Sequence, residues 1–167
     1  LDAAVTGQFN TAIGNLALTA NTSGLANTGV GFKALEDNTT GTLNTAVGQD
    51  ALANNTTASN NTGIGKSALK ANTIGTRGTA IGHLSLAANT TGNFNVAVGD
   101  SVLDANTSGT SNTAVGQNSL TNNTIASNNV AVGNNALKLN TTASNNTAVG
   151  TQALQANTTG TQNVAVG

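Results

Sequence analysis

The sequence has no cysteine, proline, methionine, tryptophan or tyrosine, and only 2% of its 167 residues are aromatic. Without cysteine the chain has neither a disulfide framework nor a thiolate metal site, and its redox compartment cannot be read from cysteine usage. Charge is equally scarce, at 7% charged residues and a net charge of −1. Such a surface does not suit nucleic acid or an anionic membrane. No apolar run approaches the ~20 residues needed to span a bilayer. We therefore expect no nucleic-acid partner and no membrane insertion within this segment.

The chain instead repeats one short pattern, Asn-Thr-Ala-Val-Gly at residues 112–116, every seventeen residues. Composition alone would suggest disorder, but a disordered tract has no reason to keep residues in fixed columns. Because the pattern recurs without any insertion or deletion, the repeats are expected to be stacked units that each fill the same space. The glycine that closes the pattern stands at Gly14, Gly31, Gly48, Gly65, Gly82, Gly99, Gly116, Gly133, Gly150 and Gly167.

The period divides the chain into coils, counted here from that glycine as position one. Residues 1–13 match positions five to seventeen of a first coil, residues 14–166 form nine full coils, and Gly167 opens the next. The sequence therefore predicts a single solenoid array over residues 1–167, taken from a longer fibre. We expect an all-β parallel β-solenoid about 45–50 Å long, at a rise of ~4.8 Å per coil, with negligible helix.

Two apolar columns, at positions five and seventeen, predict the core. The β-branched residues at positions fifteen and seventeen predict a strand over positions fourteen to seventeen, and Ala-Leu at four and five predicts a second short strand. Alternation along the first strand would place Val115 inward and Ala114 outward. The predicted core is Leu18, Leu35, Leu52, Leu69, Leu86, Leu103, Leu120, Leu137, Leu154, Val47, Val98, Val115, Val132 and Val149.

Position sixteen is Ala or Gly in every coil, whereas a water-facing strand position would accept larger polar residues. This uniformity indicates a close neighbour. One Leu and one Val or Ile per coil is also little apolar surface to set against the entropy of ordering seventeen residues. Both observations favour a parallel homotrimer, with charged positions two, three and six facing water. The predicted interchain face is Ala46, Ala80, Ala97, Ala114, Ala131, Ala148 and Ala165.

Positions eight and nine are Asn and Thr in all nine full coils. Identical residues stacked ~4.8 Å apart can hydrogen-bond in a continuous amide ladder. Seven of these asparagines also lie in glycosylation sequons, but branched sugars cannot be accommodated at every step, so any glycan would be sparse. The predicted ladder is Asn21, Asn38, Asn55, Asn72, Asn89, Asn106, Asn123, Asn140 and Asn157.

Residues that could carry chemistry are few. His83 is the only histidine and lies in a variable turn, so we interpret it as a solvated turn residue. The aspartates occupy different coil positions, unlike the regular Asp of calcium-binding β-rolls. We expect no catalytic, cofactor-binding or metal-binding residues and no enzyme activity. Ligand-binding residues are not identified by the pattern, although Phe32 and Phe94 could be contact points. An ice-binding face would need two parallel ranks of Thr on one strand face, two residues apart. Position nine supplies one such rank, but position eleven, two residues further on, is Gly or Ala.

The pattern Asn-Val-Ala-Val-Gly at residues 95–99, 129–133 and 163–167, with its Asn-Thr-Ala-Val-Gly variants, resembles the head repeats of trimeric autotransporter adhesins. Similar repeats occur in bacteriophage tail fibres. The resemblance implies a left-handed parallel β-roll of three identical chains, at a cell surface or on a virion fibre. It implies an adhesive or spacer role, with a host-surface protein or glycan as receptor.

The function expected from the sequence is thus a non-enzymatic structural or adhesive extracellular fibre segment, with a bacteriophage tail-fibre shaft as the alternative. An ice-binding solenoid and a carbohydrate-processing fibre domain are further hypotheses. The carbohydrate-processing hypothesis would require clustered carboxylates or aromatics on one face, and the sequence has neither.

Overall fold

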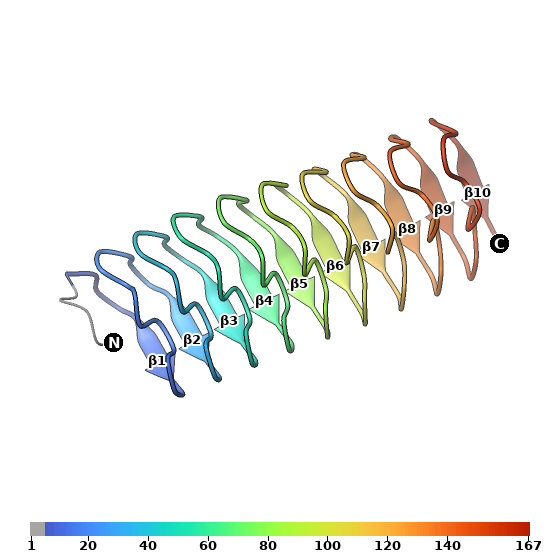
Figure 1. Cartoon of the computed structure of the whole chain (residues 1–167). Coiled ribbons are helices and arrows are strands. Elements are labelled where there is room, and N and C mark those ends of the chain that lie inside the picture. The colour runs from blue at the N-terminus through green and yellow to red at the C-terminus, as the bar shows by residue number, and fades with distance from the viewer. Residues whose placement is uncertain (1–5) are drawn as a thin grey trace.

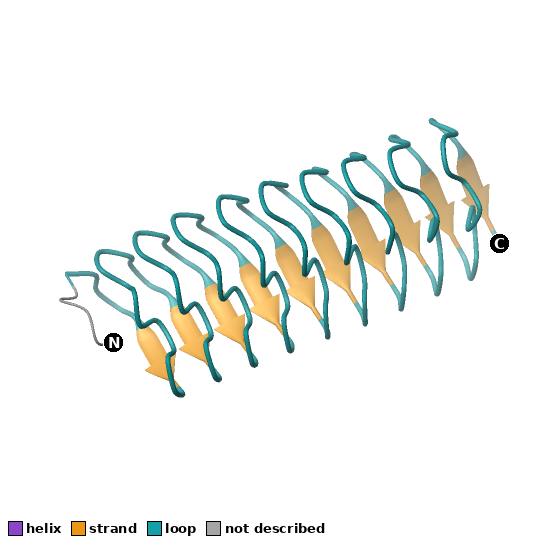
Figure 2. Ribbon diagram, in the orientation of Figure 1, coloured by secondary structure: helices purple, strands orange, loops and turns teal. Residues whose placement is uncertain are grey.

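A computed structural model describes residues 6–167 as a parallel β-solenoid in which each coil contributes one short strand to a single sheet. The strands lie side by side in sequence order along one wall, and turns form the rest of each coil (Figures 1 and 2). No helix occurs in this range. The strands are β1 (Thr11–Ile13), β2 (Thr28–Val30), β3 (Thr45–Val47), β4 (Thr62–Ile64), β5 (Thr79–Ile81), β6 (Val96–Val98), β7 (Thr113–Val115), β8 (Val130–Val132), β9 (Thr147–Val149) and β10 (Val164–Val166).

The pairing register confirms the seventeen-residue period. In β7 and β8, Thr113 pairs with Val130 and Ala114 pairs with Ala131, and every other neighbouring pair of strands has the same offset. A slip of one residue would turn every side chain of a strand to the opposite face. The identical offsets therefore keep each position of the coil in one continuous column along the solenoid.

Within residues 6–167 the second strand expected at positions four and five does not form, because the opposite wall has a different backbone. The residues at positions three and five have positive φ, as at Lys33 (φ 60) and Leu35 (φ 53). Each coil nevertheless bonds to its neighbours: the Leu18 N–H donates to Ala34 O at 3.0 Å, and the Lys33 N–H donates to Asn15 O at 3.0 Å. A left-handed conformation costs a residue with a side chain about 1–2 kcal/mol. Complete burial of a leucine contributes about 1.5–3 kcal/mol, which offsets that cost.

The core is a narrow layer between the leucine column and the strands. Every position-five leucine from Leu18 to Leu137 is fully buried, as predicted, and Leu154 near the end is partly buried. The alanines at position sixteen belong to the same core cluster. The closeness of the walls is visible at Gly29, where an added Cβ would lie 3.4 Å from Cγ of Leu18. The space opposite each leucine therefore admits a methyl group and little more.

The predicted placement of positions sixteen and seventeen is wrong by one residue. The strand alternates as expected, but the small residue points inward and the branched residues point outward. The alanines predicted as the interchain face are fully buried inside their own chain from Ala46 to Ala148, and Ala165 is half-buried. The valines predicted as core lie on the outside: Val98 is half-buried, and the exposed fractions are 36% for Val47, Val115 and Val132 and 37% for Val149.

The invariant glycine at position one ends the strand, as expected, in a conformation that side chains disfavour. Gly116 has φ +116, and a Cβ there would lie 2.7 Å from the carbonyl carbon of Gly133 in the next coil. Both the dihedral angle and the close approach of the next coil therefore require glycine. This explains why the position accepts no other residue in any coil.

Candidate functional site

The asparagine ladder at position eight is confirmed. The Asn38 side-chain Nδ2 donates to Oδ1 of Asn21 at 2.9 Å and to the Gly41 carbonyl at 3.1 Å, and the pattern continues from coil to coil up to Asn157. These amides are fully buried through most of the array. Because a glycosyltransferase must reach the side-chain nitrogen, the buried sequons of this column are poor acceptors. The column is structural.

A second amide ladder at position fourteen went unrecognised in the sequence analysis, which treated these asparagines only as the start of the strand. The Asn44 N–H donates to Oδ1 of Asn27 at 3.0 Å, and Nδ2 of Asn44 donates to Ala58 O at 2.8 Å. The signal was available, because every coil has Asn at this position except the coil with Gly78. Together the two ladders fix the turn between positions eight and fourteen, and one link of the second ladder is missing at Gly78.

The outer sheet face is the most extensive candidate interaction surface. We use this name for the side chains at positions fifteen and seventeen of β1 to β10, which point away from the core. Position seventeen is always Val or Ile, and position fifteen is Thr or Val. Along β3 to β9 the position-seventeen side chains are half-buried or up to 39% exposed, and no strand carries a charge. The solenoid thus has one uncharged, β-branched face along its whole length.

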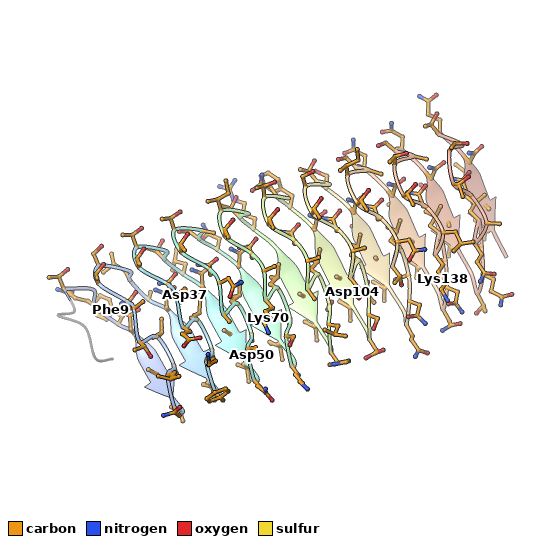
Figure 3. All side chains as sticks on the ribbon, in the orientation of Figure 1. Phe9, Asp37, Asp50, Lys70, Asp104 and Lys138 are labelled. Atoms are coloured by element: carbon orange, nitrogen blue, oxygen red, sulfur yellow. The ribbon has the colours of Figure 1, made fainter. Side chains whose placement is uncertain are left out.

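Charged residues gather instead along the turn and wall at positions two, three and six, as predicted, with Asp37 and Arg77 elsewhere. Figure 3 shows Asp50, Lys70, Asp104 and Lys138 spaced along one side of the solenoid. Lys33 Nζ lies 3.2 Å from Glu36 Oε2, and Lys70 Nζ lies 3.7 Å from Asp50 Oδ2. These surface ion pairs contribute little to stability, about 0–1 kcal/mol each.

The only histidine lies among carboxylates. Its Nδ1 is 2.9 Å from Oδ1 of Asp100, and both side chains are about half exposed. Burial raises the pKa of Asp104, the nearby His83 lowers it and the negative charge of Asp100 raises it further. Asp100 stands where the group that orients a histidine base would stand, but within residues 6–167 no nucleophile is hydrogen-bonded to the other ring nitrogen, and no pocket is found beside the pair. The arrangement is a half-exposed hydrogen-bonded pair in a turn, which agrees with the expectation for His83.

The turn at positions nine to thirteen brings together two side chains that the sequence analysis did not connect. Cζ of Arg77 lies 5.2 Å from the centroid of the Phe94 ring, one coil further along. Phe94 was named as a contact point on its own, but Arg77 was not named. The signal was their separation of seventeen residues, which places both at position thirteen.

Other site types have little support in residues 6–167. No group of three His, Cys, Asp or Glu side chains is placed to hold a metal ion in this range. The same residues include no helix of the length and apolarity that a membrane span requires. No family model, curated protein or solved structure matches the chain. The interpretation of function therefore rests on the repeat, the exposed faces and the resemblance that the repeat carries.

Proposed function

We propose that the chain is a non-enzymatic structural or adhesive segment of an extracellular fibre, in which three parallel copies pack through their outer sheet faces. The observation that carries the proposal is the exposed, uncharged column of Val and Ile at position seventeen, beside Thr or Val at position fifteen. Ten strands ~4.8 Å apart and three residues wide present a face of roughly 430 Å². The largest apolar patch on a typical monomer has a similar area, about 300–600 Å², and such patches are often functional.

A second copy is the occupant that best fits this face. A parallel partner repeats the same period, so each ridge of valines meets an equivalent ridge at the same height along the axis. The face carries no charge that such packing would bury, while the charged positions two, three and six remain in water. Closed rotational symmetry is the rule for homo-oligomers, and the resemblance to autotransporter adhesin heads favours three copies. The outer sheet face therefore replaces the alanine column as the proposed interchain surface.

The fibre could belong to a bacterial surface or to a bacteriophage tail, and the same packing serves both. The extracellular location is what the resemblance of the Asn-Val-Ala-Val-Gly repeats implies. A coiled-coil stalk or membrane anchor beside this segment in the full-length protein would favour the bacterial adhesin. A baseplate-attachment domain would favour the tail-fibre shaft.

Charge placed on the outer sheet face tests the assembly. Light scattering of the wild type should give the mass of three chains. Replacing Val115 and Val132 with Lys should reduce it to one chain, because six buried ammonium groups would meet in the trimer. The matched control places the same lysines at Gln117 and Asn134, in the turns that follow these strands, and should leave the mass unchanged. A wild-type solenoid that is folded but has the mass of one chain would refute the proposal.

Ice binding is a second candidate function, favoured by one observation. The threonines at position nine are not free, since Thr22 Oγ1 donates to Thr39 O at 3.1 Å and this bond recurs along the column. The outer sheet face, however, carries two parallel columns two residues apart, with Thr28, Thr45 and other threonines in one of them. One of these two columns is therefore a rank of mostly Thr on an exposed strand face, while the other is Val or Ile. Thermal hysteresis with ice shaping by a monomeric protein would favour this function over the fibre.

A further inference from the structure

The turn edge of the solenoid, positions nine to fourteen, departs from its repeating chemistry at one place. Among residues 6–167, Arg77 is the only charged residue on this edge, and Phe94 is its only aromatic residue apart from Phe9 in the first coil. Both stand at position thirteen, in neighbouring coils. Gly78, which follows Arg77, is also the one residue that interrupts the asparagine column at position fourteen. The coils are internal copies of one unit. A residue that differs from its counterparts in the other coils is therefore one that the solenoid does not need for folding.

Arg77 and Phe94 form one exposed unit. The guanidinium lies over the ring, with 5.2 Å between Cζ and the ring centroid, and the Phe94 N–H donates to Thr76 O at 3.1 Å, which holds the two coils together. Phe94 is 51% exposed and Arg77 is exposed. Arg77 forms no ion pair with any carboxylate of residues 6–167. A guanidinium stacked on a ring keeps its in-plane N–H donors available for a planar anion.

Neutral polar side chains extend this unit in both directions. Asn60 lies at the same position one coil before Arg77, and Ser111 lies one coil after Phe94. Backbone bonds join the row, since the Arg77 N–H donates to Ser59 O and the Ser111 N–H donates to Asn93 O. Both flanking side chains are exposed, and neither makes a hydrogen bond within the described chain. The row spans ~14 Å over three coil steps, the length of a short oligosaccharide.

We propose that Asn60, Arg77, Phe94 and Ser111 form a binding site for an acidic saccharide. A carboxylate or sulfate group pairs with the Arg77 guanidinium, and the apolar face of a sugar ring packs on Phe94. Sugar hydroxyls bond to the Asn60 amide and the Ser111 hydroxyl, which both donate and accept. The inference rests on the proposed adhesive function and identifies its ligand class.

The shape and charge of the surface favour a saccharide over a peptide or nucleic acid. No pocket is found on the surface of residues 6–167, so an anchoring peptide side chain has no cavity to enter. A nucleic acid would require many cations, whereas this edge has one. A linear sugar chain can lie along the row and contact the position-thirteen side chain of each coil. Binding to one such shallow site is weak, and three copies on a fibre raise the avidity through effective concentration.

Calorimetry on the assembled wild-type protein tests the site with three probes: trigalacturonic acid, its neutral methyl ester, and a κ-carrageenan oligosaccharide, which carries sulfate and no carboxylate. At least one acidic probe should bind, and the neutral ester should not. Binding of trigalacturonic acid alone assigns a carboxylate site, and binding of the sulfated probe alone assigns a sulfate site. Arg77→Asn and Phe94→Ser should each weaken binding by about tenfold or more. Both replacements occur naturally at position thirteen of other coils, so the fold should tolerate them.

Matched controls remove the same chemistry elsewhere: Lys138→Gln removes a cation and Phe32→Gln removes an aromatic ring, each by a residue found at that position in another coil. Both should bind as the wild type does. The inference is overturned if no acidic probe binds, if the neutral ester binds equally well, or if the Arg77 and Phe94 variants behave like the controls. Light scattering on the same samples separates the two proposals. A trimer without saccharide binding refutes only the site, and a monomer that binds through Arg77 and Phe94 refutes only the fibre assembly.

Discussion

Gly78 leaves a gap in an otherwise continuous hydrogen-bond ladder, and filling the gap should stabilise the solenoid. In the preceding coil Asn61 accepts the Gly78 N–H at 2.8 Å through Oδ1, and its Nδ2 donates to Gly75 O at 2.8 Å. Gly78 has no side chain with which to repeat either bond for the next coil. The N–H of fully buried Asn95 therefore lacks the side-chain acceptor that the other coils supply, and Gly92 O lacks one donor.

The site can accept the missing side chain. A Cβ on Gly78 would lie 3.2 Å from Oδ1 of Asn61 and 3.5 Å from Cδ1 of Leu69, and the backbone there does not have a positive φ. Each restored hydrogen bond contributes about 0.5–1.5 kcal/mol. Replacing glycine lowers the entropy of the unfolded chain, which contributes about 0.4–1 kcal/mol. Ordering the new side chain costs up to about 1 kcal/mol. With two bonds restored, Gly78→Asn should therefore increase the free energy of unfolding by about 2 kcal/mol, within limits of roughly 0.4–4 kcal/mol.

Guanidinium unfolding monitored by circular dichroism measures the change, and hydrogen exchange locates it. The Asn95 amide should exchange more slowly in Gly78→Asn, while amides three coils away should not change. The reciprocal variant Asn112→Gly opens the same gap elsewhere and should destabilise the protein by at least as much. Unchanged stability together with unchanged exchange at Asn95 would show that the ladder at position fourteen contributes no net free energy.

Two further predictions concern buried or partly buried polar groups. Ser119 Oγ is buried without a hydrogen-bond partner, so Ser119→Ala should raise the free energy of unfolding by about 1 kcal/mol, whereas Ser85→Ala should lower it by a similar amount because Ser85 Oγ donates to Ala97 O at 3.0 Å. Equal effects in the two variants would contradict this reasoning. Burial raises the pKa of Asp104, His83 lowers it and Asp100 raises it, so the folded state binds a proton there more tightly than the unfolded state. The ionised Asp104 side chain therefore destabilises the folded state above its folded pKa, and this effect is absent below the unfolded pKa of 3.8. Asp104→Asn should raise the melting temperature at pH 7 but not at pH 3.

Much of the architecture could be predicted from the sequence because a strict period converts a sequence into columns. The coil boundaries, the parallel in-register stack, the buried leucines and the amide ladder at Asn21 to Asn157 all follow from identical residues that recur at one spacing. A ladder of amides forms only if equal positions are neighbours along the axis. The period therefore predicts the contacts between coils without any knowledge of the coil's cross-section.

The cross-section itself was decided by tertiary structure. Alternation requires that Ala114 and Val115 face opposite sides, but it does not say which side is the core. The interior is narrow because Leu120 and its counterparts, in their left-handed conformation, reach across it from the opposite wall. Only a methyl group fits opposite them, so alanine turns inward and valine outward. Neither the φ of these leucines nor the distance between the walls is a local property of the strand. That distance decides which face of the strand remains available to a partner.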